Sequence, residues 1–520
     1  MAAATAAGCG STSHPVSAAR PGPESIFEPK EPLFADPVGT LNLMRQLGVD
    51  RVKVFIPWNK IAPDPDSRVR PRFNAADPAA YPAGGWSGYD TIVRDAAAQG
   101  VPLYVAVGGL APLWAAGSGA PRGAPYGGAT WKPSPSQFGE FVHAVATRYS
   151  GHYTPPGSSS PLPRVSFWSI WNEPNLGEAD LAPQAIDDST VETSPAMYRG
   201  LVDAAWSALQ QTGHGGDTIL IGELAPYGQI FSGSPGNFGE MVPLRFLRAL
   251  YCVDSSLRPL QGAAAAARGC PTTAAASKQF AHDHPGLFQA TGFAMHPYPS
   301  GRVPPNVVLP ASPDFVNLAS LPRLVHLLDT VTGLYGLSRR FPIYVTEYGY
   351  FTDPPDPDGA PLPLAAEYLN WAEYIAWSNR RVRSWDQYLL VDPGSGGPSS
   401  FVTGLELSDG EPKPTYYAAY RLPLFLPVTS AKAGQSLEVW GCVRPAHYVQ
   451  LQTQAPQQAQ IQLKPNTGGA FRTISVVTVS TQSCYFDTRV RFPSSGTVRL
   501  AWSYPHGPTV YSRPVAITIG

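Results

Sequence analysis

The sequence contains few charged residues, and it has no long apolar run. Charged residues make up 14% of the 520 residues, and the formal net charge is −1; an average soluble domain carries roughly 25% charged residues. So little charge of either sign gives no indication of a nucleic-acid or anionic-membrane partner. No apolar run reaches the roughly 18 residues that a membrane-spanning helix requires, so the sequence predicts no transmembrane segment.

Cysteine is also scarce, with only Cys9, Cys252, Cys270, Cys442 and Cys484. None of them is in a C-x-x-C motif, which argues against a zinc or redox site, and we expect no metal and no organic cofactor. The spacing allows two disulfides, Cys252 with Cys270 and Cys442 with Cys484; four buried free thiols are the alternative. Two disulfides would place the protein outside the reducing cytosol.

Cys9 follows Ala6-Ala7-Gly8 and precedes a Ser/Thr/Pro-rich stretch. This pattern is similar to the end of a bacterial lipoprotein signal, where the cysteine becomes the lipidated first residue. Only eight residues precede it, whereas a signal peptide has a basic and then an apolar region. We therefore expect an extracellular or cell-surface protein with a candidate lipid anchor at Cys9. Residues 1–23 are expected to be disordered.

Proline and glycine are abundant, at 57 and 50 residues, which predicts long, ordered loops of the kind that build binding clefts. Short apolar runs alternate with amphipathic stretches over residues 24–424. The predicted strands are residues 25–27, 51–56, 102–107, 165–170, 218–222, 292–295, 343–346 and 384–391. Eight buried strands, each followed by a helix, predict an α/β fold of the (β/α)8 TIM-barrel type. A doubly wound sheet is the alternative, but no G-x-G-x-x-G follows the first strand.

The pattern changes after about residue 427. Residues 428–520 lack helical periodicity and contain short alternating segments separated by turns. These segments are residues 436–440, 448–452, 460–464, 473–479, 488–492, 497–502 and 515–519. Seven short strands at this spacing predict a C-terminal all-β sandwich, which could bind polysaccharide or only pack against the barrel.

Two strand ends carry glutamates. The run FWSIWNEPN at residues 167–175 leads into Asn172, Glu173 and Pro174, and Pro174 ends the strand because it cannot donate to a ladder. The run IYVTEYGY at residues 343–350 places Glu347 at the end of the seventh strand. Carboxyl ends of barrel strands are where catalytic residues cluster. Glycoside hydrolysis needs two carboxyl groups that face one bond, so this pair is the candidate catalytic centre.

These motifs resemble those of clan A glycoside hydrolases, most closely family 39 and, second, relatives near family 5. The resemblance covers roughly residues 25–424. It implies that Glu173 is the acid/base and Glu347 the nucleophile of a retaining enzyme that cleaves a β-linked oligo- or polysaccharide. A carbohydrate is therefore the expected partner. The alternative is a non-catalytic glycan-binding or cell-wall-associated barrel, for which two intact acids would have no use. The sequence does not identify the sugar or the oligomeric state.

The resemblance also implies substrate-binding residues. His296 and Tyr298 end the sixth strand, where Tyr298 is expected to donate a hydrogen bond to Glu347. The other candidates are Asn172, Trp385, Trp58 and Trp114. For His296 and the three tryptophans, a place in the core is the alternative.

One position departs from the family pattern. Relatives near family 5 carry an arginine on the second strand that supports the nucleophile, and Lys53 stands at that position here. Lysine lacks the guanidinium fork, so we expect Lys53 to be a structural ion-pair partner. Glu223, at the end of the fifth strand, is a weaker candidate for substrate contact.

Overall fold

A computed structural model describes residues 22–229, 233–394, 401–479 and 483–520, so Cys9 lies outside the described residues. Eight parallel strands close into a barrel in the order β1-β10-β7-β6-β5-β4-β3-β2, which confirms the predicted (β/α)8 fold. The strands are β1 (Glu24–Glu28), β2 (Arg51–Pro57), β3 (Leu103–Gly108), β4 (Phe167–Ile170), β5 (Thr218–Leu224), β6 (Gly292–Met295), β7 (Ile343–Val345) and β10 (Val382–Tyr388). A short pair, β8 (Thr352–Asp353) and β9 (Ala360–Pro361), lies outside the barrel.

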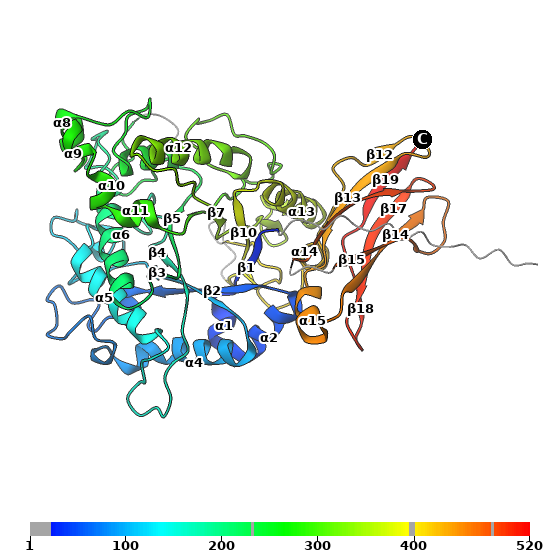
Figure 1. Cartoon of the computed structure of the whole chain (residues 1–520), viewed down its shortest axis with the longest axis horizontal. Coiled ribbons are helices and arrows are strands. Elements are labelled where there is room, and N and C mark those ends of the chain that lie inside the picture. The colour runs from blue at the N-terminus through cyan, green and yellow to red at the C-terminus, as the bar shows by residue number, and fades with distance from the viewer. Residues whose placement is uncertain (1–21, 230–232, 395–400, 480–482) are drawn as a thin grey trace, which may run out of the picture. The chain divides into compact units, whose positions relative to one another are not determined.

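A helix follows each barrel strand along the chain. These helices are α2 (Pro37–Leu47), α4 (Ala83–Gln99), α5 (Pro135–Arg148), α6 (Ser194–Gln211), α7 (Pro243–Leu250), α12 (Leu321–Leu334), α13 (Leu362–Ser378) and α14 (Pro414–Arg421). Helices α4, α5, α6 and α12 surround the strands in Figure 1. Shorter helices are α1 (Glu31–Ala35), α3 (Trp58–Ile61), α8 (Gly262–Ala266), α9 (Ala274–Ser277), α10 (Phe280–Asp283) and α11 (Pro285–Gln289). Helices α2 and α4 end where Gly48 and Gly100 adopt left-handed conformations, which glycine reaches without a steric penalty.

The barrel strands are apolar because most of their residues are buried on both faces. All six residues of β3 and all four of β4 are buried, as expected for parallel strands covered by helices. Side chains from five strands meet in the barrel interior: Ile26, Tyr104, Ala106, Phe167, Leu220 and Ala294. This packed interior fixes the strand ends that carry the candidate site.

The described residues divide into two compact units. The larger comprises Pro23–Pro361 and Ile375–Pro412, and it includes all eight barrel strands. The smaller comprises Gly22, Leu362–Tyr374 and Lys413–Gly520. Each unit contains one disulfide, Cys252–Cys270 in the larger and Cys442–Cys484 in the smaller, which confirms both predicted pairings. Among the described residues, no helix is long and apolar enough to cross a membrane.

The smaller unit contains two sheets. One is β11 (Leu424–Phe425), β13 (Ser436–Cys442) and β16 (Tyr485–Arg491); the other is β12 (Ser430–Ala431), β19 (Val515–Ile519), β17 (Gly496–Ser503), β14 (Gln457–Pro465) and β15 (Arg472–Val479), with β18 (Thr509–Tyr511) paired to β17. The predicted all-β region is confirmed, with one error. Residues 448–452 lie in helix α15 (Ala446–Thr453), because a short apolar alternation fits a strand and a single helical face equally well.

Candidate active site

Glu173, His296 and Glu347 lie just beyond the carboxyl ends of β4, β6 and β7. The chain leaves β4 through a strained turn in which Trp171 has φ 70° and Glu173 has φ 31°. Non-glycine residues with such angles cost on the order of 1–3 kcal/mol each, and they persist where the surroundings hold them. Here the Glu173 amide donates to the carbonyl oxygen of Glu223, 3.0 Å away. The turn directs the Glu173 side chain toward the barrel mouth.

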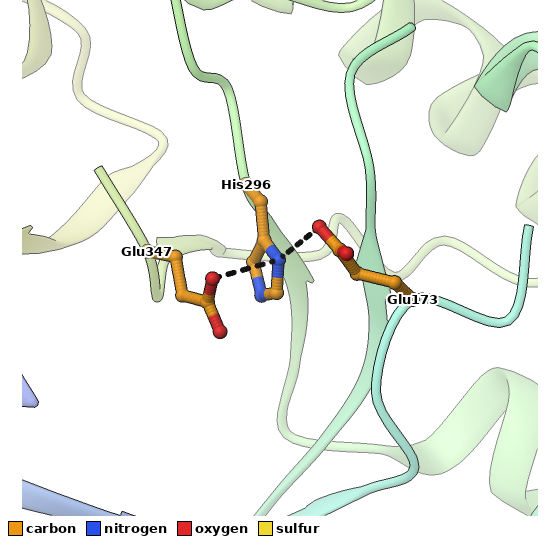
Figure 2. Close-up of side chains that lie close together, drawn as sticks. All are labelled: Glu173, His296 and Glu347. Carbon is orange, nitrogen blue, oxygen red and sulfur yellow. Dashed lines mark hydrogen bonds and ion pairs between the residues drawn. The ribbon is translucent and has the colours of Figure 1, made fainter. Parts of the chain in front are cut away.

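The three side chains converge on one point. Figure 2 shows the His296 ring between the two glutamates. Its Nδ1 lies 2.8 Å from Glu173 Oε1 and 3.5 Å from Glu347 Oε2, and one oxygen of each glutamate lies within 4.8 Å of the other. The side chains of Glu173 and Glu347 keep 15% and 11% of their surface exposed, while His296 has none. A ligand can therefore reach both carboxyl groups.

Glu347 is held by two further donors. Lys53 Nζ on β2 lies 3.0 Å from Glu347 Oε1, and the Tyr298 hydroxyl donates to Glu347 Oε2 over 3.0 Å. The Tyr298 contact is the one expected from the sequence. Lys53 also lies 3.1 Å from Glu28 and 3.7 Å from Glu223. The lysine is thus an ion-pair partner, as predicted, and one of its partners is the candidate nucleophile itself.

Glu223 lies beneath His296 and is fully buried. It accepts hydrogen bonds from His296 Nε2 (2.6 Å), from Thr346 Oγ1 (2.9 Å) and from the Tyr104 hydroxyl. Burial would raise the pKa of Glu223, but the charges of Lys53 and His296 hold it at about 2. A carboxylate so enclosed fixes the orientation of His296.

The electrostatics separate the two candidate catalytic acids. Burial raises the pKa of Glu173, and the hydrogen bond from His296 only partly offsets this. Burial would also raise the pKa of Glu347, but the charges of His296 and Lys53 outweigh it and lower that pKa. Burial would lower the pKa of His296, yet Glu347, Glu173 and Glu223 raise it to about 10. The ring is therefore an imidazolium that donates from both nitrogens.

The charge balance gives the same assignment. Lys53 and His296 contact four glutamates between them: Glu28, Glu173, Glu223 and Glu347. Lys30 adds a third cation 3.8 Å from Glu28. Three cations leave one of four carboxylates uncompensated, and a buried unpaired charge is costly. Glu173, whose pKa is raised, is the group that best retains a proton.

The structure brings some predicted residues to this centre and leaves others apart. The Asn172 amide donates to Asp180 Oδ1 over 3.2 Å, beside Glu173. Trp385 is 1% exposed and packs on Tyr348. Trp58 and Trp114 contact each other edge to face, and Trp58 has no exposed surface. All three tryptophans are buried, which fits the alternative that they belong to the core.

The ligand atoms of Glu173, His296 and Glu347 lie within 4.8 Å of one another, close enough to contact one cation. The donor set fits such an ion poorly. His296 carries a positive charge between the two carboxyl groups, and Lys53 already compensates Glu347. A metal ligand histidine must instead be neutral at the ligating nitrogen.

Comparisons with known proteins add little to these observations. No family model matches the sequence, and no curated protein is similar to it. Solved structures give weak matches. A family 39 glycoside hydrolase from Bacteroides cellulosilyticus WH2 is 15% identical, with 92% of this chain and 82% of that chain covered and a TM-score of 0.46. A glucosidase from Croceicoccus marinus is 10% identical, with 92% and 96% covered and a TM-score of 0.46. A family 1 β-glucosidase from Thermotoga maritima is 15% identical, with 72% and 81% covered and a TM-score of 0.42.

Proposed function

We propose that the protein is a retaining glycoside hydrolase in which Glu347 is the nucleophile and Glu173 the acid/base. The observation that carries this proposal is the pairing of two reachable carboxyl groups, with oxygens within 4.8 Å, whose pKa values shift in opposite directions. Retaining enzymes hold their carboxyl groups about 5–5.5 Å apart, and inverting enzymes about 6.5–9.5 Å apart. Two acids with opposed pKa shifts are also what acid and nucleophile roles require.

In the first step, Glu347 attacks the anomeric carbon as the bond to the leaving oxygen breaks. Glu173 gives its proton to that oxygen, so the leaving group departs as an alcohol and a glycosyl ester remains on Glu347. His296 donates to Oε1 of Glu173, which leaves Oε2 to carry the proton. Tyr298 and Lys53 donate to Glu347 and keep it ionised and oriented before attack.

In the second step, water replaces the leaving group. Glu173, now a carboxylate, takes a proton from this water as its oxygen attacks the anomeric carbon. The bond to Glu347 breaks, and both glutamates return to their starting states. Two displacements at one carbon retain its configuration. The β linkage in the proposal follows the sequence resemblance.

The substrate in this proposal is an oligo- or polysaccharide. Asn172, beside Glu173 in the chain, is proposed to bind the sugar 2-hydroxyl, and His296, Tyr298, Trp385, Trp58 and Trp114 stay predictions as substrate contacts. The disulfides Cys252–Cys270 and Cys442–Cys484 support an oxidising, extracellular compartment. A lipid anchor at Cys9 stays a prediction.

The decisive experiment compares Glu347→Ala and Glu173→Ala on aryl β-glycosides, with and without azide. Loss of the nucleophile should cost on the order of 10⁵-fold in kcat, and loss of the acid/base about 10²–10⁴-fold. Azide should then rescue both variants with different products. In Glu347→Ala it replaces the nucleophile and gives the inverted glycosyl azide. In Glu173→Ala it attacks the ester and gives the retained one.

Nuclear magnetic resonance spectroscopy of the products distinguishes these outcomes. The wild-type protein should release a sugar whose first-formed anomer has the configuration of the substrate. An inverted first product would contradict the retaining mechanism, and exchanged azide products would reverse the two roles. Binding of glycans with no turnover across a broad panel would favour the non-catalytic alternative.

A further inference from the structure

A cavity lies beside the candidate active site, at the carboxyl ends of β2 and β3. Its volume is about 580 Å³, within the range of roughly 300–1,000 Å³ that is usual for small-molecule sites. It shares one wall with the catalytic centre. That wall is Asp180, which accepts a hydrogen bond from Asn172, the residue that precedes Glu173. A ligand in this cavity would therefore adjoin a ligand at the glutamates.

The lining of this cavity suits a sugar ring. Its lining includes the apolar residues Phe55, Leu113 and Ala129, while Asn59 and Lys60 supply polar groups. Sugars present apolar C–H faces and a rim of hydroxyl groups, so an apolar lining with a few polar donors and acceptors matches both. Lys60 and Asp66 carry opposite charges and both are exposed. The lining thus provides no excess charge for an anionic sugar.

Asp180 supplies the buried polar group that points to a ligand. It is 6% exposed, and its Oδ1 accepts from Asn172. Among the described residues, no group donates to its second oxygen. Burial, the largest cause, raises the pKa of Asp180 well above its usual range. A neutral carboxylic acid here can donate a hydrogen bond to a hydroxyl oxygen.

We propose that this cavity binds a second, uncharged sugar unit of the substrate, next to the unit that is cleaved, with Asp180 and Asn172 joining the two positions. The proposal rests on the proposed function, because it names where the longer substrate lies. It implies that the protein acts on chains of at least two neutral sugars in preference to single glycosides.

The test measures kcat/KM for two substrates of the sugar that the enzyme cleaves: its aryl monoglycoside and its β-linked tetrasaccharide. Leu113→Trp places a larger side chain in the lining of this cavity, and Val325→Trp, on α12, does the same in a separate cavity of about 640 Å³ as the matched control. We expect the ratio of tetrasaccharide to monoglycoside kcat/KM to fall at least tenfold in Leu113→Trp and to stay within twofold of wild type in Val325→Trp.

Asp180 is tested by two substitutions. Asp180→Asn keeps a donor and an acceptor, so it should retain more of the tetrasaccharide preference than Asp180→Ala. Isothermal titration calorimetry on Glu347→Ala should also show tighter binding of the tetrasaccharide than of the single sugar, a difference that Leu113→Trp removes. A wild-type ratio in Leu113→Trp, or equal binding of both sugars, would overturn the second subsite. Absence of turnover on every glycoside would instead overturn the proposed function.

Discussion

Buried charges occur in both compact units, but they are arranged differently. In the smaller unit, Arg444 Nη2 lies 2.7 and 2.8 Å from the two oxygens of Glu373, and the Tyr485 hydroxyl donates to the same carboxylate over 2.7 Å. Both charged side chains are at most 1% exposed. One cation faces one anion there, and every carboxylate oxygen has a donor.

The barrel cluster has more carboxyl groups than cations. Lys53 forms ion pairs with Glu28, Glu223 and Glu347. His296 forms ion pairs with Glu173, Glu223 and Glu347. The cluster can relieve this imbalance only by keeping a proton on one carboxyl group. The paired arrangement leaves neither buried charge uncompensated, whereas the unbalanced one favours a proton on a carboxyl group that a ligand can reach.

The largest effect is expected from breaking the balanced pair. Arg444→Met leaves the Glu373 carboxylate buried without its cation, which should lower the free energy of unfolding by about 3–5 kcal/mol. Replacing both members, as Arg444→Met with Glu373→Leu, should recover most of this loss because no charge stays buried. Thermal and urea denaturation followed by circular dichroism measure both variants. If the double variant is no more stable than Arg444→Met alone, the loss of stability does not come from the unpaired Glu373 carboxylate, and this explanation is contradicted.

Lys53→Met should break the barrel cluster with a smaller effect. Removing the cation raises the pKa of Glu347, since Lys53 is one of the charges that lower it. The proposed nucleophile must be ionised to attack, so activity on the acid side should disappear at a higher pH than in the wild type. At neutral pH we expect kcat/KM to fall about 100-fold, similar to the loss of one charge-stabilising donor elsewhere.

The control for this variant is Lys53→Arg, which keeps the positive charge. In Lys53→Arg, the pH below which activity is lost should return to its wild-type value. The rate should stay low, because the guanidinium cannot make the same three contacts as the lysine ammonium. Circular dichroism excludes unfolding as the cause of the loss. If activity on the acid side is lost at the same pH in Lys53→Met as in the wild type, Lys53 does not set the ionisation of Glu347.

The parts of this site that are local in sequence could be predicted, while those that cross the barrel could not. Glu173 and Glu347 follow apolar strands directly, so the strand pattern alone places them at the barrel mouth. The contact from Lys53 on β2 to Glu28 on β1 depends on strand register and on side-chain length. The sequence indicates Glu223 only as a weaker candidate for substrate contact, because nothing in it shows that this side chain lies beneath His296.

The tryptophans show the same limit. Their positions after β2 and β3 and on β10 match a substrate cleft by sequence alone, yet packing decides which face of each ring is covered. Trp58 contacts Trp114, Phe138 and Phe141. Phe138 and Phe141 come from α5, far along the chain. A contact between elements so distant in sequence has no local signal, so the sequence could only leave the core alternative open.

The smallest effect is expected from Glu223→Gln, which keeps an acceptor for His296 and removes its charge. Burial opposes the protonation of His296, while the charge of Glu347 and the hydrogen bonds to Glu173 and Glu223 raise its pKa to about 10. With one of them neutral, that pKa should fall, and the imidazolium should lose its proton at a lower pH. Carbon-13 labelling of the ten histidines allows this titration to be followed by nuclear magnetic resonance, with His296→Asn to assign the signal.

We expect kcat/KM of Glu223→Gln at neutral pH to fall about tenfold, as for other buried partners that orient a functional histidine. Thr346→Val removes a donor to Glu223 without changing charge, so it should leave the His296 signal near its wild-type position. An unchanged titration in Glu223→Gln would show that the excess of carboxylates does not set the protonation of this ring.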